Sequence, residues 1–161
     1  MEKLIQRILE LQNPTVVGLD PKLEYLPKPI KEKAFGIYGK TLEGAACAYL
    51  EFNKAIIDAV CDIVPAVKPQ CAYYEVLGWQ GIRCLAETIA YAHQKGMYVI
   101  TDGKRNDIGS TMQAYAAAHL GEMEIEGVRC TPFGADALTV NGYLGTDGIQ
   151  PLLDLIRGKN D

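Results

Sequence analysis

The feature that most limits the fold of this chain is the repeated alternation of short apolar runs with longer helical patterns. The short runs are rich in β-branched residues and stop at proline, glycine or charged residues; they cover residues 15–19, 64–68, 97–102 and 137–140. Apolar residues at helical spacing lie before, between and after them, over residues 3–12, 41–62, 70–94, 111–120 and 148–156. Strands that alternate with helices pair in parallel, with the helices packed outside the sheet. The sequence therefore predicts an α/β fold.

Proline, glycine and aromatic residues refine this pattern. A loop is expected through Pro27 and Pro29, and the helical stretch over 70–94 is expected to break near Gly78 and to stop at Gly96. In that stretch Leu85, Ile89 and Ala92 are predicted to face inward. The aromatic residues of the same region are interpreted as a cluster that packs helix against sheet: Tyr73, Tyr74 and Trp79.

Length and charge exclude several functional classes. The 161 residues suit one domain, and 48% hydrophobic with 22% charged residues is ordinary globular composition. No apolar run approaches a membrane span, and a net charge of −4 makes nucleic acid a poor partner. The five cysteines are odd in number and lack a Cys-x-x-Cys pair, so neither a disulfide framework nor a zinc site is indicated. With an N-terminus unlike a secretion signal, we expect a cytoplasmic protein.

Charged residues stand where the predicted strands end. Parallel α/β proteins bind ligands at the carboxyl ends of their strands, so these residues are candidates for chemistry. They are Asp20, Lys68, Asp102, Lys104 and, three residues further on, Asp107. Asp102 and Lys104 are two residues apart and would point to the same side of an extended chain. Alternating carboxylates and ammonium groups suit reactions that form a carbanion, because the lysine stays protonated and delivers a proton.

Each of these residues also has an ordinary structural interpretation. Asp107 could cap the helix that begins near Ser110, and Asp20 could form a turn. Lys68 could be a solvated strand end, and Lys104 with Arg105 could be loop charges. The two histidines, His93 and His119, are interpreted as surface or helix-end residues, and no cluster has metal-ligand spacing.

Several segments together resemble a known family. The segment Asp102–Thr111, with the sequence Asp-Gly-Lys-Arg-Asn-Asp-Ile-Gly-Ser-Thr, is similar to the signature of orotidine 5′-phosphate decarboxylase in the longer of its bacterial subfamilies. The supporting matches follow in the expected order: Val17–Pro21, Phe52–Asn53, Val67–Gln70, Ala137–Asn141 and Tyr143–Gly145. The Asp-x-Lys-x-x-Asp core alone is shared with related sugar-phosphate decarboxylases and aldolases, whereas the series of segments is specific. One departure is Gly142, where this subfamily usually has proline.

The resemblance implies a (β/α)8 TIM barrel that acts as a homodimer without a cofactor or metal. It implies decarboxylation of a small nucleotide substrate, orotidine monophosphate, to uridine monophosphate, the last step of UMP synthesis. Lys104 then resembles the proton donor to C6 of the pyrimidine, and Asp102 the carboxylate beside the departing CO2. Lys68 and Asp107 complete the charged catalytic network.

The resemblance also assigns substrate contacts. Asp20 and Lys68 resemble contacts to the ribose hydroxyls, while Asp107 and Thr111 resemble residues that reach into the partner's site across the dimer.

The length limits how much of such a barrel is present, because a complete barrel takes ~250 residues. We expect residues 1–161 to be the N-terminal part of one barrel domain, with about the first four β/α units, and to need a partner half or self-association. Because barrels usually bind phosphate after strands 7–8, the chain alone is expected to be inactive. Two alternatives stay open: a metal-dependent sugar-phosphate decarboxylase or aldolase, and a noncatalytic α/β binding or scaffold module of flavodoxin-like shape.

Overall fold

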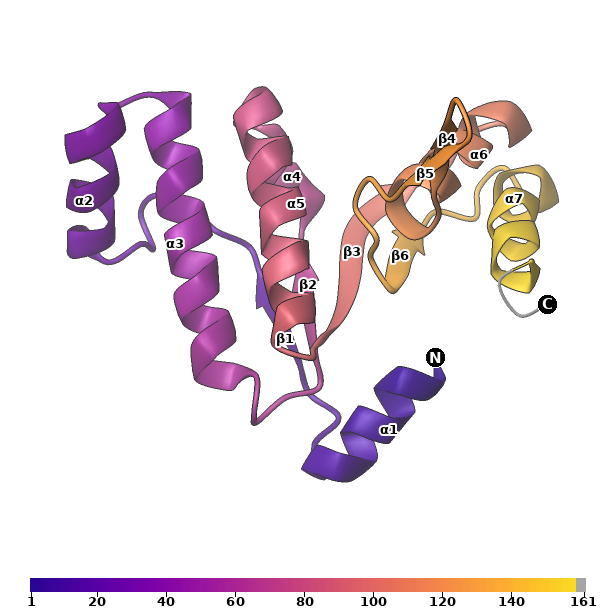
Figure 1. Cartoon of the computed structure of the whole chain (residues 1–161), viewed down its shortest axis with the longest axis horizontal. Helices are drawn as coiled ribbons and strands as arrows, with labels where there is room; N and C mark the ends of the chain where they lie inside the picture. The colour runs from indigo at the N-terminus through magenta and orange to yellow at the C-terminus, as the bar shows by residue number, and fades with distance from the viewer. Residues whose placement is uncertain (159–161) are drawn as a thin grey trace. The chain divides into compact units, whose positions relative to one another are not determined.

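The computed structural model describes residues 1–158, which form two compact units, residues 1–100 and the residues from Thr101 onward (Figure 1). The prediction of one barrel domain over 1–161 stays a prediction, and its last three residues lie outside the described ones. The first unit contains α1 (Glu2–Leu11), β1 (Val16–Leu19), α2 (Lys28–Tyr38), α3 (Leu42–Val60), β2 (Ala66–Pro69), α4 (Cys71–Glu75), α5 (Gly78–Gln94) and the start of β3 (Tyr98–Arg105).

The predicted alternation of strands and helices is confirmed, and β1, β2 and β3 pair in parallel, whereas β4 and β5 pair antiparallel. Gly18 of β1 lies opposite Lys68 of β2, and Val67 of β2 lies opposite Val99 of β3. Within the described residues the strand order is β1-β2-β3-β6, with a separate two-stranded sheet of β4 and β5. Parallel register brings the carboxyl ends of β1 and β2 together, which places Asp20 and Lys68 at the same edge of the first unit.

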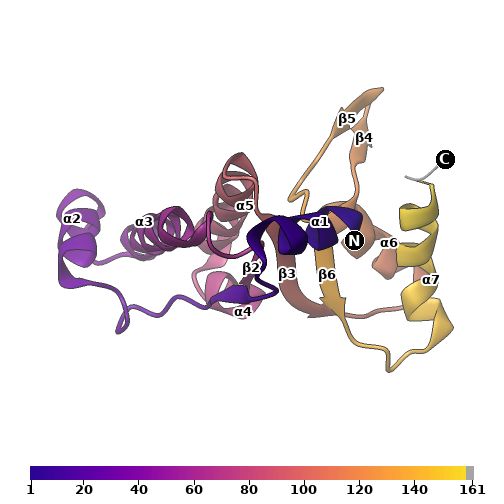
Figure 2. The ribbon, with the colours of Figure 1, turned by 90° about the horizontal axis from the view of Figure 1, so that it is seen from below.

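The helices of the first unit form a row in which α3 packs between α2 and α5 (Figures 1 and 2). The Thr41 side chain caps α3 by accepting the Gly44 N–H at 3.1 Å. Small residues such as Ala45 and Ala48 are buried on α3. On α5 the predicted inward-facing residues are buried: Leu85, Ile89 and Ala92.

The expected break near Gly78 is confirmed, because α4 ends at Glu75 and α5 begins at Gly78. Gly78 has a φ of +64°, which glycine adopts without steric cost. A Cβ at Gly81 would lie 1.8 Å from the Tyr74 carbonyl oxygen, so α4 and α5 approach more closely than any side chain permits.

The predicted loop through the two prolines is partly wrong, because residues 28–38 form α2. Pro27 occupies the N-cap position and Pro29 lies in the first turn. Backbone N–H groups have no helical partner at either place, so proline starts this helix instead of breaking it.

The second unit contains the rest of β3, then α6 (Gly109–Leu120), β4 (Met123–Ile125), β5 (Val128–Cys130), β6 (Ala137–Val140) and α7 (Thr146–Arg157). Its core is formed by Met112 and Ala116 of α6 with Leu152 of α7. Half-buried apolar side chains surround this core: Tyr115, Leu120, Leu138 and Leu155. The strand predicted over 137–140 and the helix predicted over 148–156 are both present.

The hairpin of β4 and β5 was not expected from the sequence (Figure 2). Glu126 and Gly127 have φ values of 47° and 86°, so they form a two-residue turn with both residues left-handed. Met123 and Val128 are 59% and 61% exposed, so this hairpin adds little to the described core. None of the described helices has the length and apolar character needed to cross a membrane.

A buried polar network ties three helices to the end of β1. The Asn53 amide nitrogen donates to the Tyr74 hydroxyl at 2.9 Å and to the Thr88 hydroxyl at 3.1 Å. The Tyr74 hydroxyl donates in turn to the Leu19 carbonyl at 3.3 Å. Burial raises the pKa of Tyr74 well above its usual range, so the hydroxyl remains a donor. The network thereby fixes the backbone directly before Asp20.

The aromatic interpretation is right for one residue of the three and wrong for another. Tyr74 is fully buried and packs in the core as expected. Trp79 is 66% exposed, and the Arg83 guanidinium lies over its ring at 5.3 Å. The indole ring is therefore part of the surface of α5.

We expect Tyr74→Phe to lower the free energy of unfolding by about 1–3 kcal/mol, because buried hydrogen-bond partners lose their donor or acceptor. Urea denaturation of the chain, followed by circular dichroism, measures this change. Tyr73→Phe is the matched control, since Tyr73 is only half-buried in the same helix, and its midpoint should stay near that of the parent chain. Equal midpoints for the two variants would show that the network contributes no stability.

Candidate active site

An ion pair at the end of β3 is the center of the candidate site. The Lys104 ammonium nitrogen lies 2.6 Å from Oδ1 of Asp102. The Asp102 side chain is 9% exposed, whereas that of Lys104 is 65% exposed. The carboxylate is thus withdrawn from water, while the ammonium group keeps an open side. The prediction that these two side chains point the same way is confirmed, but its assumption of an extended chain is wrong.

Lys104 reaches Asp102 through a backbone that is not extended. Its φ is +49°, in the left-handed region that residues with a Cβ rarely adopt. The Lys104 N–H donates to Oγ1 of Thr139 at 3.0 Å, and Oγ1 of Thr139 donates to Oδ1 of Asp102 at 2.7 Å. The site in the second unit therefore consists of three side chains joined by hydrogen bonds.

The local sequence explains why β6 presents Thr139 here. Oγ1 of Thr101 donates to the Ala137 carbonyl at 3.1 Å, and the Asn141 N–H donates to the Arg105 carbonyl at 3.0 Å. β6 is the neighbour of β3 in the sheet, and the backbone bond at Asn141 sets the register that brings Thr139 beside Asp102; the Thr101 hydroxyl adds one further bond between the two strands. Sequence reasoning missed Thr139, since a threonine inside a strand is ordinary on its own. One signal could have identified Thr139: it lies two residues before Asn141, within the segment Ala137–Asn141 that supports the family resemblance.

Asp107 and Thr111 lie at the start of α6. Ile108 is the N-cap residue, and α6 has no side-chain capping bond. Oδ1 of Asp107 accepts the Ile108 N–H at 2.7 Å, one residue outside the helix. The interpretation of Asp107 as a helix cap is therefore wrong. Thr111 is exposed in the first turn of α6.

Asp20 and Lys68 belong to the first unit. Asp20 is exposed and directly follows β1, while Lys68 is half-buried within β2. A turn closes from the Tyr25 N–H to the Lys22 carbonyl at 2.9 Å, so the turn begins after Asp20. A hydrogen bond with the Tyr25 hydroxyl raises the pKa of Lys22. The interpretation of Asp20 as a turn former is thus not supported, and Lys68 is less solvated than a free strand end.

The two histidines lie at helix ends, as interpreted from the sequence. His93 is exposed in the last turn of α5. His119, in the last turn of α6, is buried and stacks on Phe133 with ring centroids 5.1 Å apart. Over residues 1–158, no three His, Cys, Asp or Glu side chains are grouped closely enough to hold a metal ion.

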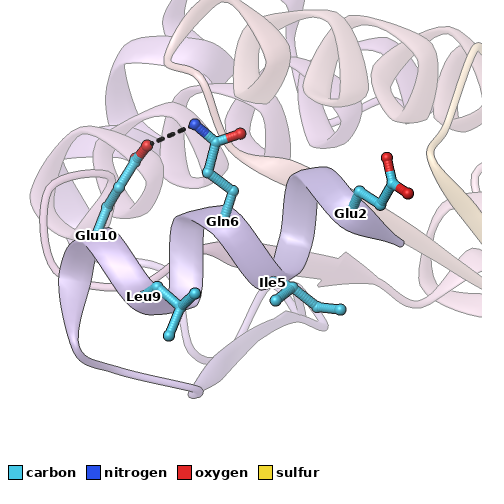
Figure 3. A pocket seen from close by; sticks show the side chains of 5 residues that line it. All are labelled: Glu2, Ile5, Gln6, Leu9 and Glu10. Atoms are coloured by element: carbon cyan, nitrogen blue, oxygen red, sulfur yellow. Dashed lines mark hydrogen bonds between the residues drawn. The ribbon is translucent and has the colours of Figure 1, made fainter.

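A shallow pocket on α1 lies at the other end of the first unit's strands (Figure 3). Ile5 and Leu9 point to one side of the helix and are 51% and 63% exposed, while the Gln6 amide donates to Glu10 at 3.0 Å. Because α1 leads into the amino end of β1, this pocket is on the side opposite Asp20. Ligands in parallel α/β folds bind at the carboxyl ends, so we do not assign the pocket to the active site.

Comparison with known proteins gives consistent results. A Rhodopirellula baltica protein named orotidine 5′-phosphate decarboxylase is 49% identical over 92% of this chain and 47% of its own length. One from Caldicellulosiruptor saccharolyticus is 35% identical over 95% of this chain and 50% of its own length. The chain thus spans about half the length of the relatives that it matches, and it corresponds to their N-terminal part.

Solved structures show the same relation. The OMP decarboxylase of Leishmania donovani superposes with a TM-score of 0.70 at 28% identity, over 95% of this chain and 48% of that one. A Toxoplasma gondii protein assigned as an orotidine-monophosphate-decarboxylase gives a TM-score of 0.74 at 30% identity, over 95% of this chain and 44% of that one.

The parallel sheet with alternating helices and the likeness to these solved structures define an α/β protein of the TIM-barrel class, of which this chain forms a partial barrel. The chain belongs to the orotidine 5′-phosphate decarboxylase / HUMPS family, whose model matches residues 15–160. The predicted family and fold class are therefore confirmed.

The left-handed backbone at Lys104 predicts an unusual order of stabilities. We expect Lys104→Gly to be more stable than Lys104→Ala by about 1 kcal/mol, since a Cβ disfavours this conformation. Both variants lose the ammonium group, so their difference in urea denaturation isolates the backbone.

The exposed strand residue Val140 provides the control for this comparison. The Val140→Gly variant should be less stable than Val140→Ala, because the strand backbone at this position is extended. If Lys104→Ala were also more stable than Lys104→Gly, the left-handed conformation of Lys104 would be refuted.

Proposed function

We propose that this chain provides the catalytic pair of an orotidine 5′-phosphate decarboxylase, which converts orotidine 5′-phosphate to UMP and CO2 without a cofactor. The observation that carries the proposal is the Lys104 ammonium held on the buried Asp102 carboxylate at the end of β3. Membership of the family and the names of the relatives support the substrate.

The reaction needs a fixed positive charge beside C6 of the pyrimidine. When the bond between C6 and the carboxylate carbon breaks, its electron pair stays on C6, where the ring delocalises it poorly. The Lys104 ammonium stabilises that charge and then transfers a proton to C6, which leaves a neutral amine. Asp102 stays ionised throughout, and the pair is restored when the amine takes a proton from water.

The remaining predicted residues complete the proposed site. Lys68 and Asp107 extend the charged network, and Asp20 with Lys68 binds the ribose hydroxyls. Asp107 and Thr111 act in the partner's site of a homodimer. The exposure of Thr111 in the first turn of α6 supports that role, since its hydroxyl is accessible to a second chain. We place this activity in the cytoplasm, where UMP synthesis would supply the substrate.

A chimera tests the function. In it this chain replaces the matching 47% of the Rhodopirellula baltica relative, to which it is 49% identical. We expect the chimera to decarboxylate orotidine 5′-phosphate, measured by the loss of orotate absorbance. Turnover that vanishes with a chelator would instead favour a metal-dependent sugar-phosphate enzyme, and a chimera that binds no UMP analogue would favour a scaffold protein.

In the chimera, Lys104→Ala should lower kcat by at least about 100-fold, the usual contribution of a proton donor. Circular dichroism and a thermal melt show whether the fold is retained. Lys95→Ala is the matched control, because Lys95 pairs with Asp58 on the surface, and its kcat should match that of the parent. Near-normal turnover of Lys104→Ala would remove Lys104 from the mechanism.

The 161-residue chain alone should show little or no turnover. The reason is that about half of each matched relative has no counterpart here, and remote binding groups normally organise such a site. The same absorbance assay, run at a hundredfold higher protein concentration than for the chimera, checks this expectation. Turnover equal to that of the chimera would contradict it.

A further inference from the structure

We infer that Thr139 is a positioning residue for the proposed decarboxylation, because its hydroxyl holds both the Asp102 carboxylate and the Lys104 backbone. This inference rests on the proposed function for its catalytic consequence. Thr139 itself is not expected to contact substrate; it acts through the pair beside it. Neither the resemblance nor the relatives' names assign it a role.

The direction of both hydrogen bonds at Thr139 follows from chemistry alone. An ionised carboxylate has no proton, so the proton between Thr139 and Oδ1 of Asp102, 2.7 Å apart, belongs to the hydroxyl. A backbone N–H can only donate, so the hydroxyl oxygen accepts the bond from Lys104 at 3.0 Å. A single hydroxyl therefore uses its one proton on Asp102 and a lone pair on Lys104, and its orientation is fixed.

Two donors meet on the same carboxylate oxygen. The Lys104 ammonium and the Thr139 hydroxyl reach Oδ1 of Asp102 at 2.6 and 2.7 Å. Bonds to an ionised acceptor are about twice as strong as neutral ones, and Asp102 is only 7% exposed, so water competes little for this oxygen. The hydroxyl therefore adds a second restraint to the carboxylate oxygen that holds the ammonium group.

The same hydroxyl stabilises the unusual backbone of Lys104. A left-handed residue with a Cβ costs roughly 1–2 kcal/mol and persists only where its surroundings enforce it. The bond from the Lys104 N–H to Thr139 ties this backbone to β6. That conformation turns the lysine side chain back toward Asp102, two residues earlier. Thr139 thus controls where the proposed proton donor lies.

The expected consequence falls on kcat. A misplacement of about 1 Å between reacting groups can cost about 100-fold in rate. Substrate binding would change less, because neither hydrogen bond of Thr139 involves a binding group. In the chimera we expect Thr139→Val to lower kcat by about 10- to 100-fold, with KM within about threefold of the parent value.

Two further variants separate positioning from a structural role. Thr139→Ser keeps the hydroxyl and should restore kcat to within about threefold of the parent value. Thr101→Val removes another threonine hydroxyl that bonds β3 to β6, but this one reaches the Ala137 carbonyl and neither member of the pair. Its kcat should stay within about threefold of the parent value. The inference fails if Thr139→Val retains kcat, or if Thr101→Val loses as much as Thr139→Val.

Nuclear magnetic resonance on the 161-residue chain gives a readout that is independent of turnover. In Thr139→Val the Lys104 amide proton should move upfield and exchange faster with solvent, and the Asp102 carboxyl carbon should shift. Thr139→Ser and Thr101→Val should leave both signals near their parent positions.

The two experiments distinguish failure of the inference from failure of the proposed function. An inactive parent chimera counts against the function, and the resonance data then decide alone whether Thr139 positions the pair. Unchanged Lys104 and Asp102 signals in Thr139→Val would overturn the inference even if the chimera were active.

Discussion

The contact between the Lys104 ammonium and the Asp102 carboxylate is the interaction on which the proposed chemistry of this chain depends. A buried carboxylate is costly unless a partner compensates for its lost hydration. Asp102 has two donors on one oxygen, one of them charged, and so it can stay ionised in a position that is 7% exposed. The ammonium group, in contrast, keeps most of its surface open. One side of the pair is therefore fixed by the protein and the other faces outward.

This arrangement breaks one local preference of the chain. A strand would ordinarily keep Lys104 extended, yet its φ is +49°. Departures from local preference concentrate at functional sites, where neighbouring structure enforces them. Here β6 stabilises the departure, because the Thr139 hydroxyl accepts the N–H of the strained residue. The same β3–β6 pairing that builds the sheet thus holds the strain in place.

The sequence predicts the elements whose signals are local and regular. The strand over 137–140 and the break near Gly78 follow from apolar runs and from glycine. Two elements, α2 and the hairpin of β4 and β5, were not predicted, for different reasons. The prolines at the start of α2, Pro27 at the N-cap and Pro29 in the first turn, are also common in loops, and a helix start was not considered. The hairpin did carry a signal, since apolar and charged residues alternate on either side of Glu126 and Gly127, but its strands are only three residues long.

The residues of the candidate site also differ in how far the sequence predicts them. Charges at predicted strand ends pointed to Asp102 and Lys104, because a spacing of two places side chains on one face. Thr139 is far away in sequence and becomes part of the site only through the register of β6 on β3. Trp79 shows the opposite error, since a large aromatic residue near other aromatics was taken for core and is 66% exposed. Register and burial depend on contacts between distant segments, which a single sequence does not display.

These contacts also indicate how the protein holds the charged groups of the proposed site in position. The pair and its threonine come from β3 and β6, two neighbouring strands of the sheet, and every hydrogen bond among them joins two groups of the protein itself. Electrostatic stabilisation is most effective when the charged groups need no rearrangement as charge develops on the reacting carbon. Binding energy from a distant phosphate would then bring C6 of the pyrimidine against the Lys104 ammonium group. It would not be needed to position that ammonium group. For this reason a change at Thr139 should act on the chemical step, whereas changes in remote binding groups should act mainly on how the substrate is held.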